Sequence, residues 1–227
     1  MKKIIGVILF VLLSANLSSA QILKPSLQVT VKEAYSSVLS HYEIKDEVSG
    51  IPGVQLEVTY DINSQWGIYG NFGADFISAK NSTGRIDATT TYEQKTSTQL
   101  SGYGGPRFYF NIPMSPTKIF VDAGIGIYST KLGDQNFTST TTDPATTITA
   151  SYSYVSQWGT NLGAGINIAA GTNMIINLGA KYHFIFKKSD ETVTRTLSTG
   201  TSNNFTGDIP EHSYIQFAAG IGYRFGL

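Results

Sequence analysis

The sequence predicts an all-β protein: a closed, antiparallel, eight-stranded up-and-down barrel that crosses a membrane with its strands. Beyond residue 20 no run of eighteen apolar residues occurs, so a helical membrane span is not expected. Charged residues make up only 14% of the chain, against about 25% in ordinary soluble domains, while Gly (23), Tyr (13) and Phe (12) are abundant. Eight segments alternate apolar with small or polar residues, the pattern of strands that face lipid on one side and a barrel lumen on the other.

The first twenty residues have the layout of a secretory signal peptide. Lys2 and Lys3 precede a short apolar run from Ile4 to Leu13, and small residues occupy the positions before the predicted cleavage site, Ser18 and Ala20. We therefore expect a signal peptide over residues 1–20 and one barrel domain over residues 21–227. The chain has no cysteine, so neither lipid attachment at Gln21 nor a disulfide framework is expected.

The first strand is predicted from Ser26 to Leu39. Leu27, Val29 and Val31 begin a regular outward row, but Glu33 then falls on the same lipid-facing side. Two interpretations are open: a β-bulge between Val31 and Tyr35 restores the alternation, or the strand leaves the hydrocarbon near Lys32.

Three strands are predicted between residues 54 and 110. Apolar residues occupy the even positions of residues 54–61, from Val54 to Tyr60, and most even positions of residues 65–76, from Trp66 to Phe76. The segment 100–110 is weaker. Phe108 and Phe110 alternate with Arg107 and Tyr109, but Pro106 lacks an N–H group and is expected at a sheet edge or a bulge.

Four strands follow with clearer patterns. Apolar residues occupy the odd positions of residues 118–127, the even positions of 157–168 and 174–187, and the odd positions of 213–227. The inward glycines of these strands form G-x-G triplets, but none opens a helix, so nucleotide binding is not expected. We interpret them as space for large side chains in a narrow lumen.

The connections alternate in length. Residues 62–64, 111–117 and 169–172 form short turns, whereas residues 40–52, 79–97, 132–153 and 188–212 form long loops. This rhythm predicts short periplasmic turns and long extracellular loops. The loops are rich in Thr and Ser, and two interpretations are open: a β-sheet that protrudes beyond the membrane, with a turn at Asp143 to Ala145, or solvated loops without regular structure.

The last strand carries the most specific motif, a terminal pattern of glycine and aromatic residues at Gly220, Tyr223 and Phe225, with Leu227 two residues further on the same face. With this strand the chain resembles the eight-stranded outer-membrane β-barrel family, the type of the OmpA transmembrane domain, OmpX and OmpW. The resemblance implies a bacterial outer-membrane location, contact with membrane lipids and lipopolysaccharide, and recognition by the barrel-assembly machinery. Family members commonly end on an aromatic residue, whereas this chain ends on Leu227.

Nine charged residues are predicted to face the lumen with nearly balanced signs. They are Lys32, Glu57, Asp61, Asp75, Arg107, Lys118, Asp122, Lys181 and Arg224. An unpaired charge in a narrow, poorly hydrated lumen costs several kcal/mol, so balanced signs favour a salt-bridge network that plugs the barrel. The competing interpretation is that the same groups line a narrow polar channel or ligand cavity.

Enzymatic interpretations depend on histidine. His41 and His212, beside Ser40 and Ser213, are expected at the outer rim, where a catalytic or metal site would need more ligands than two histidines supply. No cofactor or metal site is expected, and 16 basic against 16 acidic residues make nucleic acid an unexpected partner. The sequence thus predicts a non-enzymatic outer-membrane protein that supports envelope integrity and presents its loops for adhesion to a host or cell-surface ligand, as loops do in OmpX-like relatives. The alternatives are a narrow porin-like channel and, third, a rim enzyme acting on lipid.

Overall fold

The computed structural model describes residues 25–39, 48–79, 82–139, 141 and 146–226. The predicted signal peptide lies outside these residues. Within them, no helix has the length and apolarity needed to cross a bilayer.

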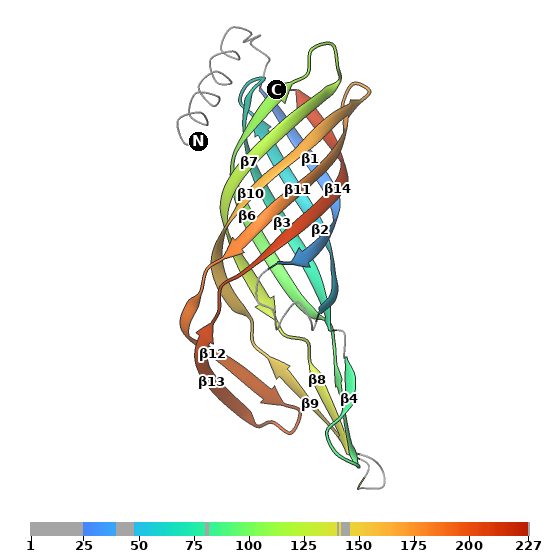
Figure 1. Cartoon of the computed structure of the whole chain (residues 1–227), viewed down its shortest axis with the longest axis vertical. Helices are drawn as coiled ribbons and strands as arrows, with labels where there is room; N and C mark the ends of the chain where they lie inside the picture. The colour runs from blue at the N-terminus through green and yellow to red at the C-terminus, as the bar shows by residue number, and fades with distance from the viewer. Residues whose placement is uncertain (1–24, 40–47, 80–81, 140, 142–145, 227) are drawn as a thin grey trace.

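Eight antiparallel strands close into a barrel, as predicted (Figure 1). They are β1 (Ser26–Val38), β2 (Val48–Asp61), β3 (Trp66–Ala79), β6 (Ser97–Asn111), β7 (Thr117–Lys131), β10 (Val155–Ala170), β11 (Met174–Ile185) and β14 (His212–Gly226). The order around the barrel is β1-β14-β11-β10-β7-β6-β3-β2, so the first and last strands pair and the barrel has no open edge. Closure satisfies the backbone groups that an open sheet would expose to lipid.

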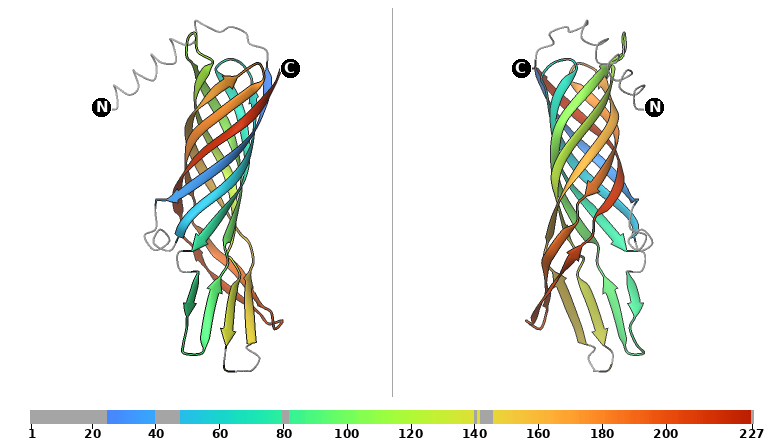
Figure 2. Two further views of the ribbon diagram at one scale, coloured as in Figure 1. Left: turned by 90° about the vertical axis from the view of Figure 1, so that its right-hand side faces the viewer. Right: turned by 60° about the vertical axis from the view of Figure 1, so that its left-hand side comes forward.

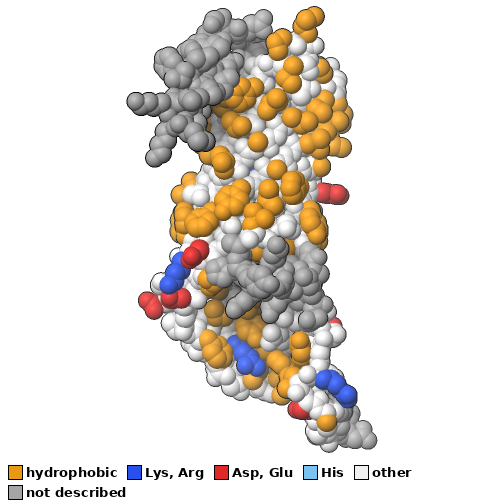
Figure 3. Space-filling model, in the orientation of Figure 1, with side chains coloured by type: hydrophobic (Ala, Val, Ile, Leu, Met, Phe, Trp, Pro, Cys, Tyr) orange, Lys and Arg blue, Asp and Glu red, His pale blue; other side chains and the backbone are white. Residues whose placement is uncertain are grey.

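The predicted alternation holds along the barrel strands. Inward side chains are mostly buried, while large hydrophobic side chains cover the outside, among them Phe72 and Leu162 at 64% exposure. Figure 3 shows this hydrophobic surface along the barrel, with most of the visible charged side chains near or beyond its lower end. An apolar surface of this extent is typical of a protein that meets hydrocarbon rather than water.

Glu33 interrupts this surface without a bulge. Pairing of β1 with β14 runs without a shift from Ser26 to Val38, and Glu33 lies in register with Ala219 and with Val54 of β2. Its side chain is exposed on the outer face. The bulge interpretation is therefore wrong, and the depth of Glu33 in the membrane stays a prediction.

Pro106 also sits in a regular strand. It pairs with Ile68 of β3, and the register between β6 and β7 is the same before and after it, at Gly104 with Ile125 and at Arg107 with Asp122. The expectation of an edge or a bulge is wrong. The missing N–H group is accommodated by a gap in the β6–β7 pairing instead of a shift.

The long connections form a second sheet beyond the barrel. Its strands are β4 (Thr83–Arg85), β5 (Thr90–Gln94), β8 (Gln135–Ser139), β9 (Thr146–Tyr152), β12 (Lys188–Leu197) and β13 (Ser202–Ile209), in the order β13-β12-β9-β8-β5-β4. We call it the protruding sheet. Figures 1 and 2 show it at the end opposite the short turns and the C-terminus. Of the two interpretations left open for the long loops, the structure shows the protruding sheet, while the turn expected at Asp143 to Ala145 lies outside the described residues.

Candidate functional site

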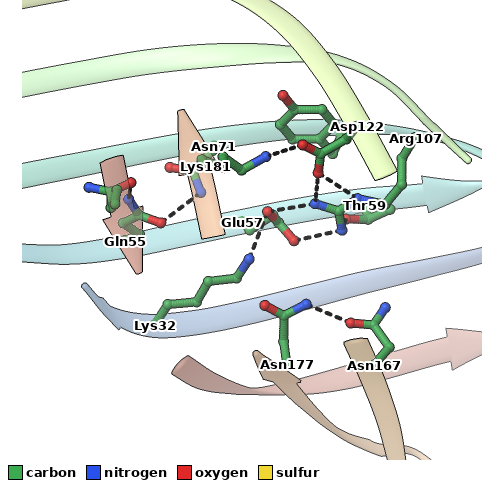
Figure 4. Close-up of polar contacts among 12 residues, drawn as sticks. Lys32, Gln55, Glu57, Thr59, Asn71, Arg107, Asp122, Asn167, Asn177 and Lys181 are labelled. Carbon is green, nitrogen blue, oxygen red and sulfur yellow. Dashed lines mark hydrogen bonds and ion pairs between the residues drawn. The ribbon is translucent and has the colours of Figure 1, made fainter. Parts of the chain in front are cut away.

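A chain of ion pairs crosses the barrel lumen (Figure 4). Lys32 Nζ lies 2.8 Å from Glu57 Oε2, and Arg107 Nη1 lies 2.8 Å from Glu57 Oε1. Arg107 Nη2 lies 2.6 Å from Asp122 Oδ2, and Lys181 Nζ lies 2.6 Å from Asp122 Oδ1. We call these five residues the lumen ion-pair chain. It joins β1, β2, β6, β7 and β11 through groups of alternating sign.

Arg107 is the centre of this chain. Only 1% of Arg107 is exposed, and its guanidinium lies 4.1 Å from the ring centre of Phe120 and 4.9 Å from that of Tyr69. Lys181 Nζ lies 3.9 Å from the centre of the same Tyr69 ring. Aromatic faces attract cations, so the charges are enclosed by rings as well as by carboxylates. The arrangement fills the lumen at this level.

The other four predicted lumen charges lie apart from the ion-pair chain. Asp61 accepts hydrogen bonds from Ser26 Oγ (3.1 Å) and from Gln28 Nε2. Asp75 accepts one from Gln216 Nε2 at 3.1 Å. The structure therefore stabilises these two carboxylates with neutral donors rather than with the predicted cations.

The other two predicted cations, Lys118 and Arg224, form no ion pair with a carboxylate within the described part of the chain. Lys118 Nζ lies 5.3 Å from the ring centre of Tyr109. Arg224 is half-buried, and its backbone N–H donates to Asn173 O at 2.7 Å. The predicted salt-bridge network therefore forms among five of the nine charges, and Lys118 and Arg224 are not part of it.

Side chains outside the nine predicted lumen charges close the lumen on the side toward the protruding sheet. Gln216 Oε1 accepts a hydrogen bond from Gln55 Nε2 (2.5 Å), and Gln216 Nε2 donates to Ser36 Oγ (3.1 Å) as well as to Asp75. Beyond it, Tyr128 Oη lies 2.9 Å from His183 Nδ1, and the His183 ring stacks on Tyr214 at 4.5 Å. These residues occupy inward-facing positions of their strands, as the charged residues do. That alternation is the sequence signal that could have identified them.

Little free volume is left beside the ion-pair chain. The cavity lined in part by Lys32, Gln55, Lys181 and Gln216 measures about 10 Å³. That is close to the room needed for one water molecule. Inward glycines are packed closely against neighbouring protein groups: a Cβ on Gly126 would lie 2.5 Å from Gly102 O and 2.8 Å from Tyr103 Cα.

The predicted terminal motif lies along the end of β14. Tyr223 and Phe225 face outward with ring centres 4.8 Å apart, and Tyr223 Oη accepts a hydrogen bond from Asn173 Nδ2 at 2.7 Å. Gly220 faces inward, where an added Cβ would collide with Val31 O and the Lys32 side chain. Leu227 lies outside the described residues. Recognition of this strand by the assembly machinery stays a prediction.

The predicted histidine pair at the rim is described only in part. His212 begins β14 and Ser213 is buried beside it, whereas Ser40 and His41 lie outside the described residues. Among the residues that are described, no three His, Asp or Glu side chains are grouped for a metal ion.

The protruding sheet has two chemically different faces because its strands alternate in register. One face, which we call the hydroxyl face, carries Thr192, Thr194 and Thr196 of β12 opposite Thr206, Asn204 and Ser202 of β13. The pairing of the remaining strands extends the same face across the sheet. Its further residues are Thr149 and Thr147 of β9, Asn136 and Thr138 of β8, Glu93 and Thr91 of β5, and Thr83 and Arg85 of β4. The other face carries larger apolar groups, including Tyr92, Phe137, Ile148, Val193 and Phe205.

Solved structures from several bacteria are similar to this chain. A major outer membrane protein from Thermus thermophilus aligns with a TM-score of 0.54 and 11% identity, covering 88% of this chain and 99% of that one. The outer membrane protein OprG from Pseudomonas aeruginosa aligns with a TM-score of 0.51 and 15% identity, covering 92% and 99%. At these low identities the structural alignments show a shared fold alone. A search of curated protein sequences found no match.

A family model gives the broader assignment. The model described as outer membrane protein beta-barrel domain matches residues 5–225, almost the whole chain. The match agrees with the closed eight-stranded barrel and with its hydrophobic outer surface. The chain therefore belongs to the outer membrane protein beta-barrel domain family, whose members span the bacterial outer membrane.

Proposed function

We propose that this protein is a non-enzymatic outer-membrane barrel that is closed to small ions and binds a surface ligand through its protruding sheet. The observation that carries the proposal is Arg107. Its side chain bonds to Glu57 and Asp122 across the lumen, where all three groups are buried. A filled lumen leaves the protruding sheet as the part of the molecule available for interaction.

The direction of the sheet follows from the connections. Short turns and the C-terminus lie at one end of the barrel, and the protruding sheet lies at the other. In outer-membrane barrels the short turns face the periplasm and the long connections face the outside of the cell. The protruding sheet is accordingly extracellular in our proposal. The barrel wall contacts lipids and lipopolysaccharide, and the closed pairing of its strands contributes to envelope integrity.

Export and assembly complete the proposal. Residues 1–20 direct export and are removed, and the β14 row containing Tyr223 and Phe225 is read by the barrel-assembly machinery. Replacing both aromatic residues with Ser is expected to lower the yield of folded barrel in the outer membrane. A matched replacement of Thr192 and Thr194, which lie in the protruding sheet, is expected to leave that yield unchanged, and an equal loss in both variants would contradict the role of the β14 row.

Conductance tests the closed lumen. The purified full-length protein in planar bilayers is expected to give no stable small-ion current. A reproducible conductance in the wild-type protein would overturn the closed-barrel proposal and favour the porin-like route for small solutes.

Adhesion tests the protruding sheet. A variant in which two-residue turns replace residues 83–93 and 191–207 removes most of the β4–β5 and β12–β13 hairpins and keeps the sequence of all eight barrel strands. Cells displaying the wild-type protein are expected to attach to a monolayer of a second cell type more strongly than cells displaying the trimmed variant. Equal attachment, with equal amounts of folded barrel at the surface, would refute the binding role of the sheet.

A further inference from the structure

The hydroxyl face is held in a fixed arrangement by its own hydrogen bonds. Thr192 Oγ1 lies 3.1 Å from Thr206 Oγ1, and Thr194 Oγ1 donates to Asn204 Oδ1 at 3.0 Å. Toward the other end of the sheet, Thr149 Oγ1 donates to Asn136 Oδ1 at 2.8 Å. Each oxygen keeps a free acceptor position after these bonds. The side chains are therefore oriented before any ligand arrives, which reduces the entropy lost on binding.

A hollow lies at the β4–β5–β8 corner of the protruding sheet. Its volume is about 480 Å³, within the range of about 300–1,000 Å³ that is usual for small-molecule sites. Six side chains of the hydroxyl face line it: Thr83, Arg85, Thr91, Glu93, Asn136 and Thr138. On the opposite face the Tyr92 ring lies against Gly84, where an added Cβ would collide with it. The Tyr92 ring therefore packs against the β4–β5 hairpin on the face opposite the hollow.

The polar groups of this hollow are chemically complementary to sugar hydroxyls. Arg85 can only donate hydrogen bonds, ionised Glu93 can only accept them, and Asn136 does both. Arg85 and Glu93 form no ion pair with each other in the described part of the chain, and Arg85 Nη2 donates to Ala88 O at 3.3 Å. A pyranose presents adjacent hydroxyls that each donate and accept. Charged partners make such bonds roughly twice as strong as neutral ones.

The charge of the protruding sheet disfavours a polyanionic ligand. Lys187 Nζ lies 2.6 Å from Asp208 Oδ2, and Lys188 Nζ lies 2.7 Å from Glu191 Oε2. These cations are already paired, and the hollow holds one cation beside one carboxylate. Binding of a sulfated or phosphorylated chain requires a cluster of free cations, which these residues do not form. The observations favour an uncharged, hydroxyl-rich ligand.

We propose that the hollow at the β4–β5–β8 corner, together with the adjoining hydroxyl face, binds a neutral oligosaccharide. One hexose unit occupies the hollow, where Glu93 accepts hydrogen bonds from its hydroxyls and Arg85 donates to them. Further units lie along the paired Thr and Asn side chains. This inference rests on the proposed function, because it names the ligand class of the sheet that the proposed function makes a binding surface.

An immobilised glycan panel tests the inference. The full-length protein in nanodiscs is applied to neutral, sialylated and sulfated oligosaccharides, and Kd is measured for the neutral glycans that bind. Glu93→Gln and Asn136→Ala are each expected to raise Kd about tenfold, the loss of one strong hydrogen bond. Asn203→Ala is the matched control, since Asn203 is exposed on the opposite face of β13, and its Kd is expected to be unchanged.

The outcomes separate this inference from the proposed function. Binding restricted to sulfated or sialylated glycans, or an equal effect of Asn203→Ala and Asn136→Ala, would overturn the carbohydrate assignment. Absence of any glycan binding, with attachment still lost in the trimmed variant, would overturn it too, and would point to a protein ligand while leaving the binding role of the sheet standing. Retained attachment in the trimmed variant would instead refute the proposed function itself.

Discussion

Arg107 and Glu57 form two parallel hydrogen bonds across the barrel lumen, Nη1 to Oε1 at 2.8 Å and Nη2 to Oε2 at 2.9 Å. The residues belong to β6 and β2, which are separated around the barrel by β3. The bond therefore spans the interior instead of joining adjacent strands. Paired geometry of this kind is the strong form of an arginine–carboxylate contact, and it ties two sides of the barrel together.

Removing the guanidinium should destabilise the barrel strongly. In Arg107→Met, Glu57 keeps only Lys32 and Asp122 keeps only Lys181 as a cationic partner. Breaking a buried ion pair from one side typically costs about 3–5 kcal/mol, and we expect a loss of about that size in the free energy of unfolding. Reversible urea unfolding from lipid vesicles measures it.

An exposed ion pair provides the control for this variant. Lys187 and Asp208 are each half-exposed at the base of the protruding sheet. Lys187→Met should leave the unfolding midpoint unchanged, because solvent-exposed pairs contribute little. If Arg107→Met behaved like this control, the ion-pair chain would not stabilise the barrel.

The strands of the barrel could be predicted because lipid imposes a period of two on them. Ile215, Phe217 and Ile221 lie outward and Gln216 lies inward, as their parity requires. Glu33 and Pro106 break local rules but keep their register, because pairing on both sides over the full strand outweighs one unfavourable residue. A local sequence pattern does not show whether strand pairing or the unfavourable residue makes the larger contribution to the free energy.

The alternation of residues along each strand also predicted correctly which charged side chains face the lumen. It could not predict which cation pairs with which carboxylate. Which cation reaches which carboxylate depends on the stagger between strands, and that stagger is a property of barrel closure. Asp75 meets the amide of Gln216, a residue 141 positions away. Such a contact has no signature in the sequence.

Glu33 should lower the stability of the barrel in the membrane. It lies on the outer face between Ala219 and Val54, in a row of lipid-facing side chains. A charged side chain on the lipid face is unfavourable, and for Glu the penalty is below the roughly 2–4 kcal/mol of Arg or Lys at the bilayer centre. Glu33→Leu should therefore raise the free energy of unfolding in vesicles by about 1 kcal/mol. Ser37→Leu, a control on the same face of β1, should have a smaller effect, and equal effects would show that Glu33 lies outside the hydrocarbon.

Replacing glycine with alanine should change the stability of the barrel differently on the inner and outer sides of its wall. A Cβ on Gly126 would lie 2.5 Å from Gly102 O, which is backbone and cannot rotate away. On Gly102 the nearest atoms are those of the Phe72 ring at 3.7 Å, an ordinary contact. Gly126→Ala should destabilise the barrel by about 1–3 kcal/mol through overpacking, whereas Gly102→Ala should be neutral or stabilising by about 0.5 kcal/mol. Thermal unfolding followed by gel mobility compares the two, and a reversed order would contradict the inward packing of the Gly126 position.

Acid should loosen the hairpin that carries the hollow of the protruding sheet. Asp87 Oδ1 accepts hydrogen bonds from Thr89 N–H (2.8 Å), Thr89 Oγ1 (2.9 Å) and Thr90 N–H (2.8 Å) in the turn between β4 and β5. These bonds, first that of the Thr89 backbone, lower the pKa of Asp87 below its ordinary value. A carboxyl whose pKa is lower in the folded state stabilises that state above its unfolded pKa, about 3.9 for Asp, and this stabilisation is lost as the pH falls through the folded pKa.

Carboxyl ¹³C NMR of the folded protein measures this titration directly. Asp87 should titrate below the value of a free Asp side chain, and Thr89→Ala, which removes the hydroxyl donor, should raise its pKa part of the way back. Asp208 gives an internal comparison, because its pKa is lowered mainly by the hydrogen bond from Lys187 and should not respond to Thr89→Ala. Lys187→Ala should have the converse effect, raising the pKa of Asp208 and leaving that of Asp87 unchanged. An ordinary pKa for Asp87 in the wild-type protein would mean that the turn does not form in solution, and the hollow beside it would then lose its supporting hairpin.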